Sequence, residues 1–293
     1  MGDHMKIRIF QKGFNYSQDG QGNRLVYHLQ GCNMRCPWCS NPEGMSPSGT
    51  LFVEPDWLLD SVCPHGAISG KKLNRSKCAT CEQRECLTIH RNKGIYLSCV
   101  QQETRQTVED ILSASPMFYD GGGVTFTGGE PTMQAEALAE VLASVKAEDI
   151  HTAIETNGSY PGLPEMFPLI DQLIIDCKQI DPDKHKAATG ISNVRILENL
   201  TQAAGNHPRV HIRVPMIGKV NDSQEDVQNF IRFFRKLAGP NVTFEILTYH
   251  EYGKNKWEQC GLNYQMGDAH IDSRKAAEAR QAFRDAGLNY QTT

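Results

Sequence analysis

The sequence predicts an α/β fold: a partial (β/α)6, TIM-like barrel that is interrupted by a small cysteine-rich insert. Patterns of strand, glycine-bearing loop and helix alternate along most of the 293 residues, which is typical of parallel β/α units. About six strands follow from Leu25 onward, fewer than the eight of a closed barrel. Residues 51–102 break the pattern, because they are polar, rich in cysteine and poor in periodic apolar positions.

The expected domain organisation is a barrel start at 1–50, the insert at 51–102 and the rest of the barrel at 103–293. The expected strands are 24–30, 122–131, 150–158, 172–179, 209–217 and 242–250. The expected helices are 104–116, 132–148, 222–239 and 273–287. We expect Thr107 to be the N-cap of the first helix and Gly239 to close the third.

Composition excludes several classes of protein. The formal net charge of −4 gives no reason to expect a nucleic-acid partner. The chain contains no apolar run of about 18 residues and no apolar leader, so we expect no membrane span and a cytoplasmic location. Seven of the ten cysteines fall between Cys32 and Cys86 in two tight groups, and in a reducing cytosol such clustering indicates metal binding rather than disulfides.

The first cysteine group is Cys32, Cys36 and Cys39. A structural zinc ion needs four ligands, and the loop offers no obvious fourth. Three thiolates instead suit a [4Fe-4S] cluster with one iron left open, where a substrate can bind. The cysteines follow the first predicted strand, and polar motifs follow the next ones: "TGGEP", "ETNG", "DCKQ" and "TYH". Parallel strands bring such ends to one mouth, so we expect a shared site.

These motifs carry a resemblance to a known family. The Cys-x3-Cys-x2-Cys spacing, with Trp38 before the last cysteine, and the glycine loop at 128–130 resemble the radical S-adenosylmethionine (SAM) superfamily. The stretches "HLQGCNMRCPWCSNPE", "GGGVTFTGGEP" and "TYHEYGKNKW" further resemble the glycyl radical enzyme activating enzymes, the pyruvate formate-lyase activase group. Ser40 departs from that activase, which has a histidine there, and this argues against pyruvate formate-lyase as the partner.

The resemblance implies a reaction. A reduced [4Fe-4S] cluster, held by Cys32, Cys36 and Cys39 as the catalytic centre, cleaves SAM to methionine and a 5′-deoxyadenosyl radical. That radical takes a Cα hydrogen from one glycine of a partner protein, a glycyl radical enzyme. The expected electron donor is a flavodoxin or ferredoxin, and we expect the activase to be a monomer.

The resemblance also implies which residues contact the cosubstrate. Gly128 and Gly129 allow close approach of the backbone, and Glu130 accepts hydrogen bonds from the amino group of SAM. The other implied cofactor-binding residues are Trp38, Glu155, Asp176, Lys178, Arg213 and His250. Glu155, Thr156 and Asp176 match a monovalent cation site, although the family has aspartate where this chain has Glu155.

The second cysteine group is Cys63, Cys78, Cys81 and Cys86. One Cys-Pro pair followed by a three-cysteine run resembles half of a two-cluster ferredoxin. We therefore expect a ferredoxin-like insert with one auxiliary [4Fe-4S] cluster, although related inserts carry two. Cys99 could replace Cys63 as a ligand, and a zinc ion could occupy the same thiolates. An electron relay and a docking surface are both compatible with the pattern.

Two other functions compete with the activase. A radical SAM enzyme that acts on a small molecule would use the second cluster to bind its substrate, but four apparent protein ligands argue against this. A non-catalytic iron–sulfur or zinc scaffold would leave the glycine loop and the polar strand ends unexplained.

Overall fold

One eight-stranded sheet forms the centre of the computed structural model, which describes residues 5–82, 84–89 and 94–292. The strand order is β12-β11-β10-β9-β8-β2-β1-β7. The six strands from β2 to β12 along this order are parallel, which confirms the predicted partial barrel. Their bounds are Asn23–Leu29 (β2), Gly123–Gly128 (β8), Thr152–Thr156 (β9), Gln172–Asp176 (β10), Val210–Met216 (β11) and Val242–Thr248 (β12).

Two strands that the sequence did not predict extend this sheet. β1 (Lys6–Tyr16) pairs antiparallel with β2, and β7 (Val100–Glu103) pairs antiparallel with β1. Residues 100–102, which the sequence placed in the insert, therefore belong to the main sheet. The parallel strands end at β12 on one side and at β2 on the other, where β1 and β7 continue the sheet.

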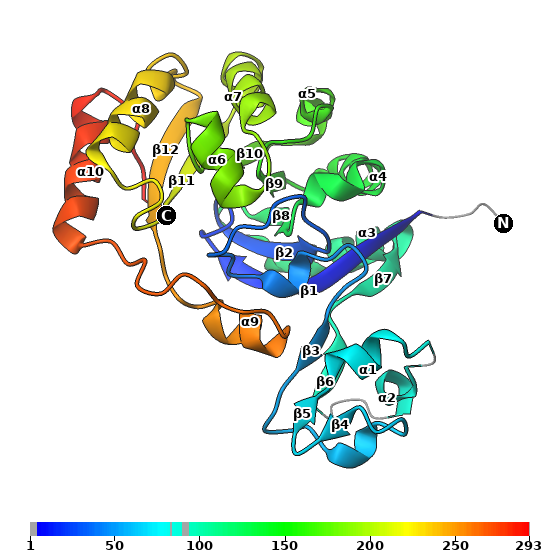
Figure 1. Cartoon of the computed structure of the whole chain (residues 1–293). Coiled ribbons are helices and arrows are strands. Elements are labelled where there is room, and N and C mark those ends of the chain that lie inside the picture. The colour runs from blue at the N-terminus through cyan, green and yellow to red at the C-terminus, as the bar shows by residue number, and fades with distance from the viewer. Residues whose placement is uncertain (1–4, 83, 90–93, 293) are drawn as a thin grey trace.

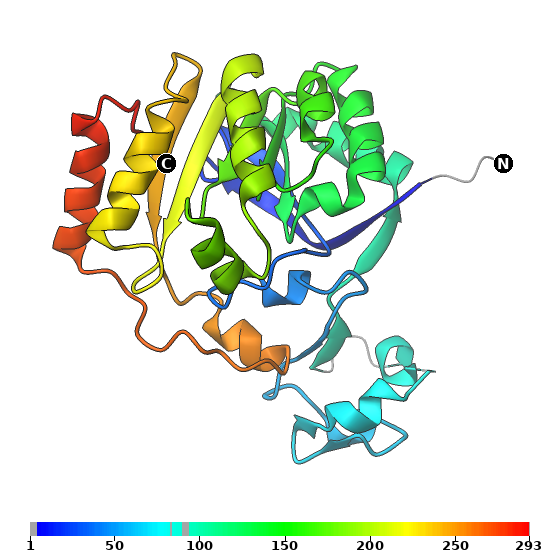
Figure 2. The ribbon, with the colours of Figure 1, turned by 45° about the horizontal axis from the view of Figure 1, so that its top comes forward.

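Helices cover the outer face of the sheet (Figures 1 and 2). They are α3 (Thr104–Ala114), α4 (Ala135–Lys146), α5 (Leu163–Met166), α6 (Pro182–Thr189), α7 (Val194–Asn206), α8 (Gln224–Phe234) and α10 (Ser273–Asp285), while α9 (Lys254–Gln259) lies towards the insert. Short 3-10 helices span Pro42–Gly44, Asp60–Val62, Ser115–Met117, Pro131–Gln134 and Phe167–Leu169. No helix in the described ranges is long and apolar enough to cross a membrane.

Strand alternation separates an apolar outer layer from a polar interior. Outward residues such as Tyr27, Phe126 and Phe244 are fully buried in the core beneath the helices. Their neighbours in the strands face the inside of the barrel; Arg24, for example, donates from Nε to Thr125 Oγ1 at 2.6 Å. The interior of the barrel therefore has the polar side chains that the chemistry of a site requires.

Two predicted helix boundaries were wrong. α3 begins at Thr104 with Glu103 as its N-cap residue, three residues before Thr107. The hydroxyl of Thr107 donates to the carbonyl of Glu103 at 3.2 Å, so it bonds within the helix instead of capping it. α8 ends at Phe234, and the chain turns at residues 235–237 before it reaches Gly239. The start of α8 is fixed by a capping box at Ser223.

The insert has a small core of its own. Its elements are β3 (Leu51–Val53), β4 (Ile68–Ser69), β5 (Lys72–Leu73), α1 (Arg75–Ala79), α2 (Glu85–Ile89) and β6 (Ile95–Leu97). Val53, Leu58, Val62, Ile68, Cys86 and Ile95 form a cluster separate from the barrel core. At the neck, Ser98 N donates to Thr50 O and Thr50 N donates to Ser98 Oγ, both at 2.9 Å.

Candidate active site

The largest cavity described, about 860 Å³, lies at the C-terminal mouth of the parallel strands. Its wall includes Cys32, Cys36, Cys39, Trp38, Gly128, Gly129, Glu155, Thr156, Asp176, Lys178 and His250. Most of the residues that the sequence predicted for the site thus meet in one space. Glu130 and Arg213 lie behind this wall, with their polar groups bonded to other protein atoms.

The cluster loop, residues 30–44, carries the first three cysteines and is held by its own backbone. Gly31 N donates to Gly44 O at 2.7 Å, and the buried Gln30 side chain donates to Glu43 O at 2.8 Å. The amides of Met34 and Asn41 donate to the sulfurs of Cys32 and Cys39, each at 3.4 Å. Such amide–sulfur bonds stabilise negative charge on sulfur, as a metal-bound thiolate requires.

Burial keeps these thiols protonated in the absence of metal. It raises the pKa of Cys36 and of Cys39 to about 12, and it raises the pKa of Cys32 as well. Metal binding must therefore displace protons from all three groups. The thiols lie on the wall of an open cavity, which suits a cluster that binds one thiolate per iron.

Glu130 holds two loops together and does not face the cavity. Its Oε1 accepts hydrogen bonds from Thr132 N at 3.0 Å, Thr132 Oγ1 at 2.5 Å and Thr156 Oγ1 at 2.7 Å. Its Oε2 accepts from Asn157 N at 2.7 Å, and the residue is 1 % exposed. Four protein donors thus reach the carboxylate, while its predicted contact with the amino group of SAM stays a prediction.

The two glycines before Glu130 are required by the backbone next to them. A Cβ on Gly128, whose φ is +118°, would lie 2.4 Å from Leu29 N. A Cβ on Gly129 would lie 2.3 Å from Gly31 O. Gly129 N donates to Leu29 O at 3.0 Å and Glu130 N donates to Gly31 O at 2.7 Å. The glycine loop is therefore pressed against the start of the cluster loop, and this close packing requires glycine at both positions.

Arg213 joins two carboxylates inside the barrel. Its Nη1 donates to Glu155 Oε1 at 2.8 Å, and its Nε lies 3.3 Å from Glu245 Oε2. Its Nη2 also donates to the carbonyl of Gln18. The residue is 4 % exposed. Burial alone would lower its pKa, but Glu155 and Glu245 outweigh burial and raise it, so Arg213 stays charged.

Lys178 and Asp176 form an ion pair on the cavity wall, with Nζ and Oδ2 2.5 Å apart. Burial alone would lower the pKa of Lys178, but Asp176 and the nearby thiols of Cys36 and Cys32 raise it overall. The predicted cation ligands Glu155 and Asp176 thus already have cationic partners. Within residues 5–82, 84–89 and 94–292, no three His, Cys, Asp or Glu side chains are arranged to hold a single metal ion.

His250 and Trp38 occupy opposite environments on the cavity wall. The ring of His250 stacks on Tyr252, which is 84 % exposed, with the ring centroids 4.2 Å apart. Burial lowers the pKa of His250, so the imidazole is mostly neutral at pH 7. Trp38 is buried in the barrel core and also lines the cavity. His250 is therefore placed to contact a ligand, while Trp38 fixes the cluster loop.

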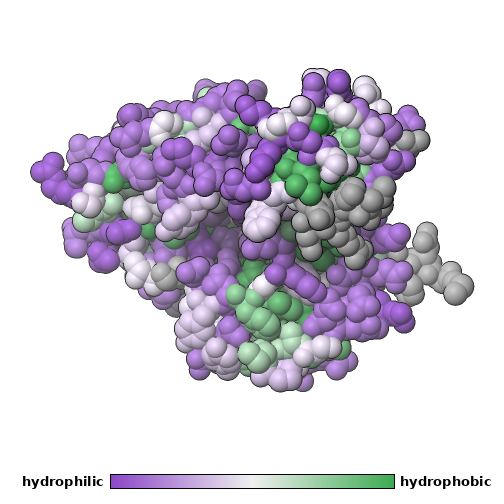
Figure 3. All heavy atoms as spheres, turned by 90° about the horizontal axis from the view of Figure 1, so that it is seen from below, coloured by the Kyte–Doolittle hydropathy of each residue, from purple (hydrophilic) through white to green (hydrophobic). Residues whose placement is uncertain are grey.

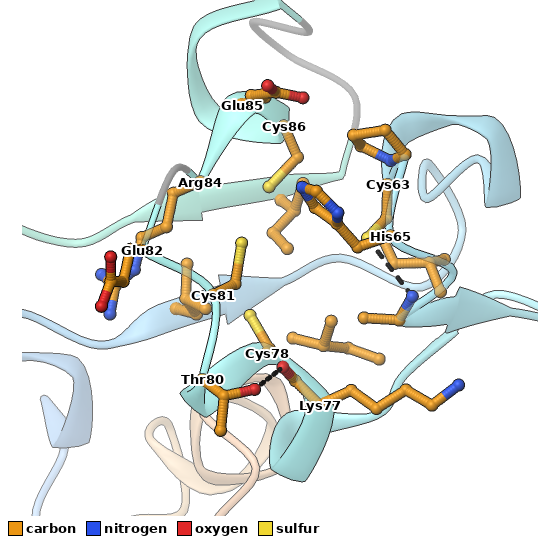
Figure 4. Close-up of a pocket in the computed structure, with 16 residues that line it drawn as sticks. Cys63, His65, Lys77, Cys78, Thr80, Cys81, Glu82, Arg84, Glu85 and Cys86 are labelled. Carbon is orange, nitrogen blue, oxygen red and sulfur yellow. Dashed lines mark hydrogen bonds between the residues drawn. The ribbon is translucent and has the colours of Figure 1, made fainter.

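The second cysteine group surrounds a separate cavity of about 460 Å³ in the insert. Figure 4 shows the side chains of Cys63, Cys78, Cys81 and Cys86 around one space. Burial and the neighbouring thiols together raise the pKa of Cys86. The four thiols therefore line one space, where they are placed as candidate ligands of a single metal centre.

Cys99 lies away from this cavity. A Cβ on Gly49 would lie 2.6 Å from Cys99 Cβ, so Cys99 packs at the neck of the insert. The described residues that line the insert cavity include Cys63 and not Cys99. This geometry supports Cys63 as the fourth thiol of the group.

Sequence reasoning missed three residues of the site. Asp19, Glu245 and His28 all line the large cavity. Strand alternation could have found Glu245, because it is two residues from Thr243 on the same inner face, and His28 likewise shares the inner face of β2 with Arg24. Asp19 lies in the turn between β1 and β2, which enters the barrel interior, and no local pattern predicts that path.

Comparison with known proteins agrees with this geometry. The model of the Radical SAM superfamily matches residues 26–234, so the chain is a radical SAM protein. It is 33% identical over 288 residues to the 4-hydroxyphenylacetate decarboxylase activating enzyme of Clostridioides difficile, covering 92% of this chain and 90% of the relative. It is 32% identical to the isethionate sulfite-lyase activating enzyme of Desulfovibrio desulfuricans, with 87% and 86% covered.

A solved structure shows the same fold at lower identity. Streptococcus suis SuiB bound to S-adenosylmethionine aligns with a TM-score of 0.58 and 13% identity, over 92% of this chain and 49% of that one. The chain belongs to the glycyl radical enzyme activating enzymes of the radical SAM superfamily. Its reaction is the reductive cleavage of SAM to a 5′-deoxyadenosyl radical, which abstracts a glycine Cα hydrogen from a partner enzyme.

Proposed function

We propose that Cys32, Cys36 and Cys39 hold the [4Fe-4S] cluster of this reaction, with one iron open to the amino and carboxylate groups of SAM. The observation that carries the proposal is the common cavity: the three thiols and the polar ends of four further strands line the same space. The cluster, when bound, supplies the electron that cleaves the sulfonium bond. The protein supplies the shape and the charges around it.

The charges of the cavity suit a sulfonium cosubstrate. Asp19, Glu155, Asp176 and Glu245 line the wall together with Lys178, Lys256 and Arg280, so the cavity offers both signs of charge to a zwitterionic ligand. Lys178 is one of the cations that line the cavity, and because the thiols of Cys36 and Cys32 lie near it, it would face the carboxylate of SAM. His250, with Tyr252 stacked on it, would lie against the adenosyl group. Arg213, Glu130 and Thr156 would act by holding these groups in place.

The second part of the proposal is an auxiliary [4Fe-4S] cluster on Cys63, Cys78, Cys81 and Cys86. The four thiols line one cavity, which supports a metal centre there, and their ferredoxin-like order along the chain favours a cluster over a single zinc ion. We treat residues 51–102 as the insert, with residues 100–102 tying it back to the sheet. A cluster of this kind has no open iron, so it would not bind SAM.

A protein substrate needs a way into the barrel. The large cavity is lined both by β1, through Gln11 and Asn15, and by β12, through Leu247, so it reaches the two ends of the parallel wall. Seen from the side of the insert, the surface is mainly hydrophilic, with hydrophobic patches beside a hollow (Figure 3). We propose that the glycine-bearing loop of a partner glycyl radical enzyme enters between β1 and β12.

The remaining components follow from the same chemistry. A low-potential flavodoxin or ferredoxin would donate the electron to a monomeric activase. Oxygen-sensitive clusters held by free thiols suit an anaerobic cytoplasm. The panel of partners to test contains arylacetate decarboxylases and isethionate sulfite-lyase, because activases of these enzymes are the relatives of this chain.

Anaerobic reconstitution tests the proposal. The iron-loaded protein is incubated with SAM, a one-electron reductant and each partner of the panel, and 5′-deoxyadenosine and the glycyl radical signal are measured. We expect both products with one partner. Formation of 5′-deoxyadenosine without a protein radical for any partner would favour the small-molecule reading, and its absence would favour a scaffold.

A further inference from the structure

Helix α9 contacts the cluster loop on one side. Trp257 Nε1 donates to the carbonyl oxygen of Cys39 at 2.9 Å. Lys256 Nζ donates to Asn41 Oδ1 at 2.9 Å and to Glu43 Oε1 at 2.6 Å. Gly253, just before the helix, is so close that a Cβ there would lie 2.7 Å from the same Cys39 oxygen. α9 is therefore packed directly on the backbone that carries the third thiol of the first group.

The other end of α9 contacts the insert. Arg75 is the first residue of α1, the helix that carries Cys78. Its Nη1 donates to Leu51 O at 2.9 Å within the insert, and its Nη2 donates to Gln259 O at 2.8 Å at the end of α9. A Cβ on Gly261, whose φ is +73°, would lie 1.9 Å from Arg75 Nε. The guanidinium is thus held between the two parts of the molecule.

The middle of this contact is shielded from water, while Arg75 itself is half-buried. Trp257 is 9 % exposed, and Cys260 between the two ends of the contact is buried. Burial raises the pKa of Cys260 to about 12, so its thiol stays neutral there. Burial also lowers the pKa of Arg75, although the guanidinium remains charged.

We propose that α9 couples the two cysteine groups, with Arg75 and Trp257 as positioning residues for the radical reaction. Cluster assembly in the insert orders α1 and places Arg75 where it donates a hydrogen bond to Gln259 O. The seated helix then fixes the carbonyl of Cys39 through Trp257, and with it the loop that positions the first cluster. Figures 1 and 2 both show α9 between the barrel and the insert. The inference rests on the two-cluster assignment proposed above.

The test compares Arg75→Ala with Lys77→Ala in the iron-loaded protein. Lys77 is a cation on the same helix whose side chain points away from the thiols (Figure 4). Hydrogen exchange is measured over residues 30–44 and 254–260, together with the SAM dissociation constant. For Arg75→Ala we expect at least about tenfold faster exchange in both segments, from the loss of a charged hydrogen bond, and weaker SAM binding. For Lys77→Ala we expect neither change.

Arg75→Lys is a rescue variant, because the lysine ammonium can restore the hydrogen bond to Gln259 O but not, at the same time, the one to Leu51 O. We expect intermediate exchange at 254–260. Trp257→Phe keeps an aromatic ring at this position but removes the indole N–H, together with part of the buried ring. Without that donor the site is less electron-withdrawing, so we expect the reduction potential of the first cluster to become more negative while that of the insert stays unchanged.

Unchanged exchange in an Arg75→Ala protein that holds both clusters would overturn the proposal. If the Arg75→Ala protein loses the cluster of the insert, an unchanged reduction potential of the first cluster in Trp257→Phe would overturn the proposal instead. Wild-type protein with only one cluster would overturn the coupling but not the activase reaction. The proposed function fails on a separate result, which is wild-type protein that leaves no radical on any partner.

Discussion

At the scale of single residues, the carboxylates of the site divide into those that face the cavity and those that hold it together. Glu130 belongs to the second kind, since its two oxygens accept four hydrogen bonds from Thr132, Thr156 and Asn157. Its burial raises its pKa while those donors lower it, and the net shift is upward. Its removal should therefore damage the fold of the loops before it damages cosubstrate contact.

We expect Glu130→Gln to lower the free energy of unfolding by about 1–3 kcal/mol, because an amide nitrogen cannot accept from these donors. Anaerobic thermal and chemical denaturation would measure this. Glu136→Gln is the matched control, since Glu136 is an exposed glutamate in the first turn of α4. If the Glu130→Gln protein has wild-type stability but no longer binds SAM, the result would instead support direct contact between Glu130 and SAM.

His151 makes the free energy of unfolding of the barrel depend on pH in the acidic range. Burial and the neighbouring Arg24, whose Nη1 lies 3.2 Å from His151 Nδ1, lower the pKa of His151 to about 4. An unfolded histidine titrates near 6.5, so between these values the unfolded chain binds more protons. The stability that neutral His151 contributes is present above pH 6.5 and is lost as pH falls towards 4.

Between pH 7.5 and 6.0 we expect a loss of about half a kcal/mol from this group, allowing for its partial exposure. His151→Gln should flatten that part of the stability profile measured by denaturation. The exposed His270→Gln serves as comparison and should keep the wild-type slope. Equal slopes for all three proteins would contradict the assignment.

At the scale of elements, the sequence predicted the parallel strands because each has an apolar run between glycine-bearing turns. It also predicted that Cys32, Asp176 and His250 share a mouth, because topology fixes where parallel strands end. It could not predict the orientation of Glu130 or Arg213. Their partners come from other strands and loops, and a side chain at a strand end can turn towards the cavity or into the wall. β1 escaped notice because its alternation is broken by Gln11, Lys12 and Gly13.

The two cysteine-bearing elements should differ when a thiol is removed. Cys36→Ala takes one of three protein ligands from the cluster that binds SAM, so we expect cleavage of SAM to fall to background even with a strong artificial reductant. Cys81→Ala should lose the insert cluster but keep SAM cleavage with that reductant, while partner activation falls further. A well-folded Cys81→Ala protein that keeps the first cluster and binds SAM but cannot cleave it would reopen the small-molecule reading.

At the scale of the whole molecule, the two cysteine groups are held by two different means. The first lies on loops at the mouth of a large core, and the second in a small insert whose core contains Cys86 itself. A core of that size contributes little stability, so we expect the insert to depend on the proposed cluster for folding.

Reconstituted protein should therefore contain about eight irons per chain, from two cubanes. Iron and sulfide analysis with Mössbauer spectroscopy would count them. Chelation should melt the insert in hydrogen-exchange experiments while the barrel core stays protected. Four irons and one zinc per chain would replace the second cluster by a structural ion and leave the activase reaction unchanged.

The neck of the insert has a consequence for how such chains diversify. Thr50 and Ser98 are joined by two backbone-anchored hydrogen bonds, so the chain leaves the barrel and returns to it at nearly the same point. A tight turn could bridge that point, and the whole segment could be excised or exchanged as a cassette without moving a barrel strand. The contact that such an exchange would break is the one between Arg75 and Gln259. Any replacement segment must bring its own hydrogen-bond donor for the carbonyl of Gln259. Without one, α9 would contact the loop at residues 30–44 with no support from the insert.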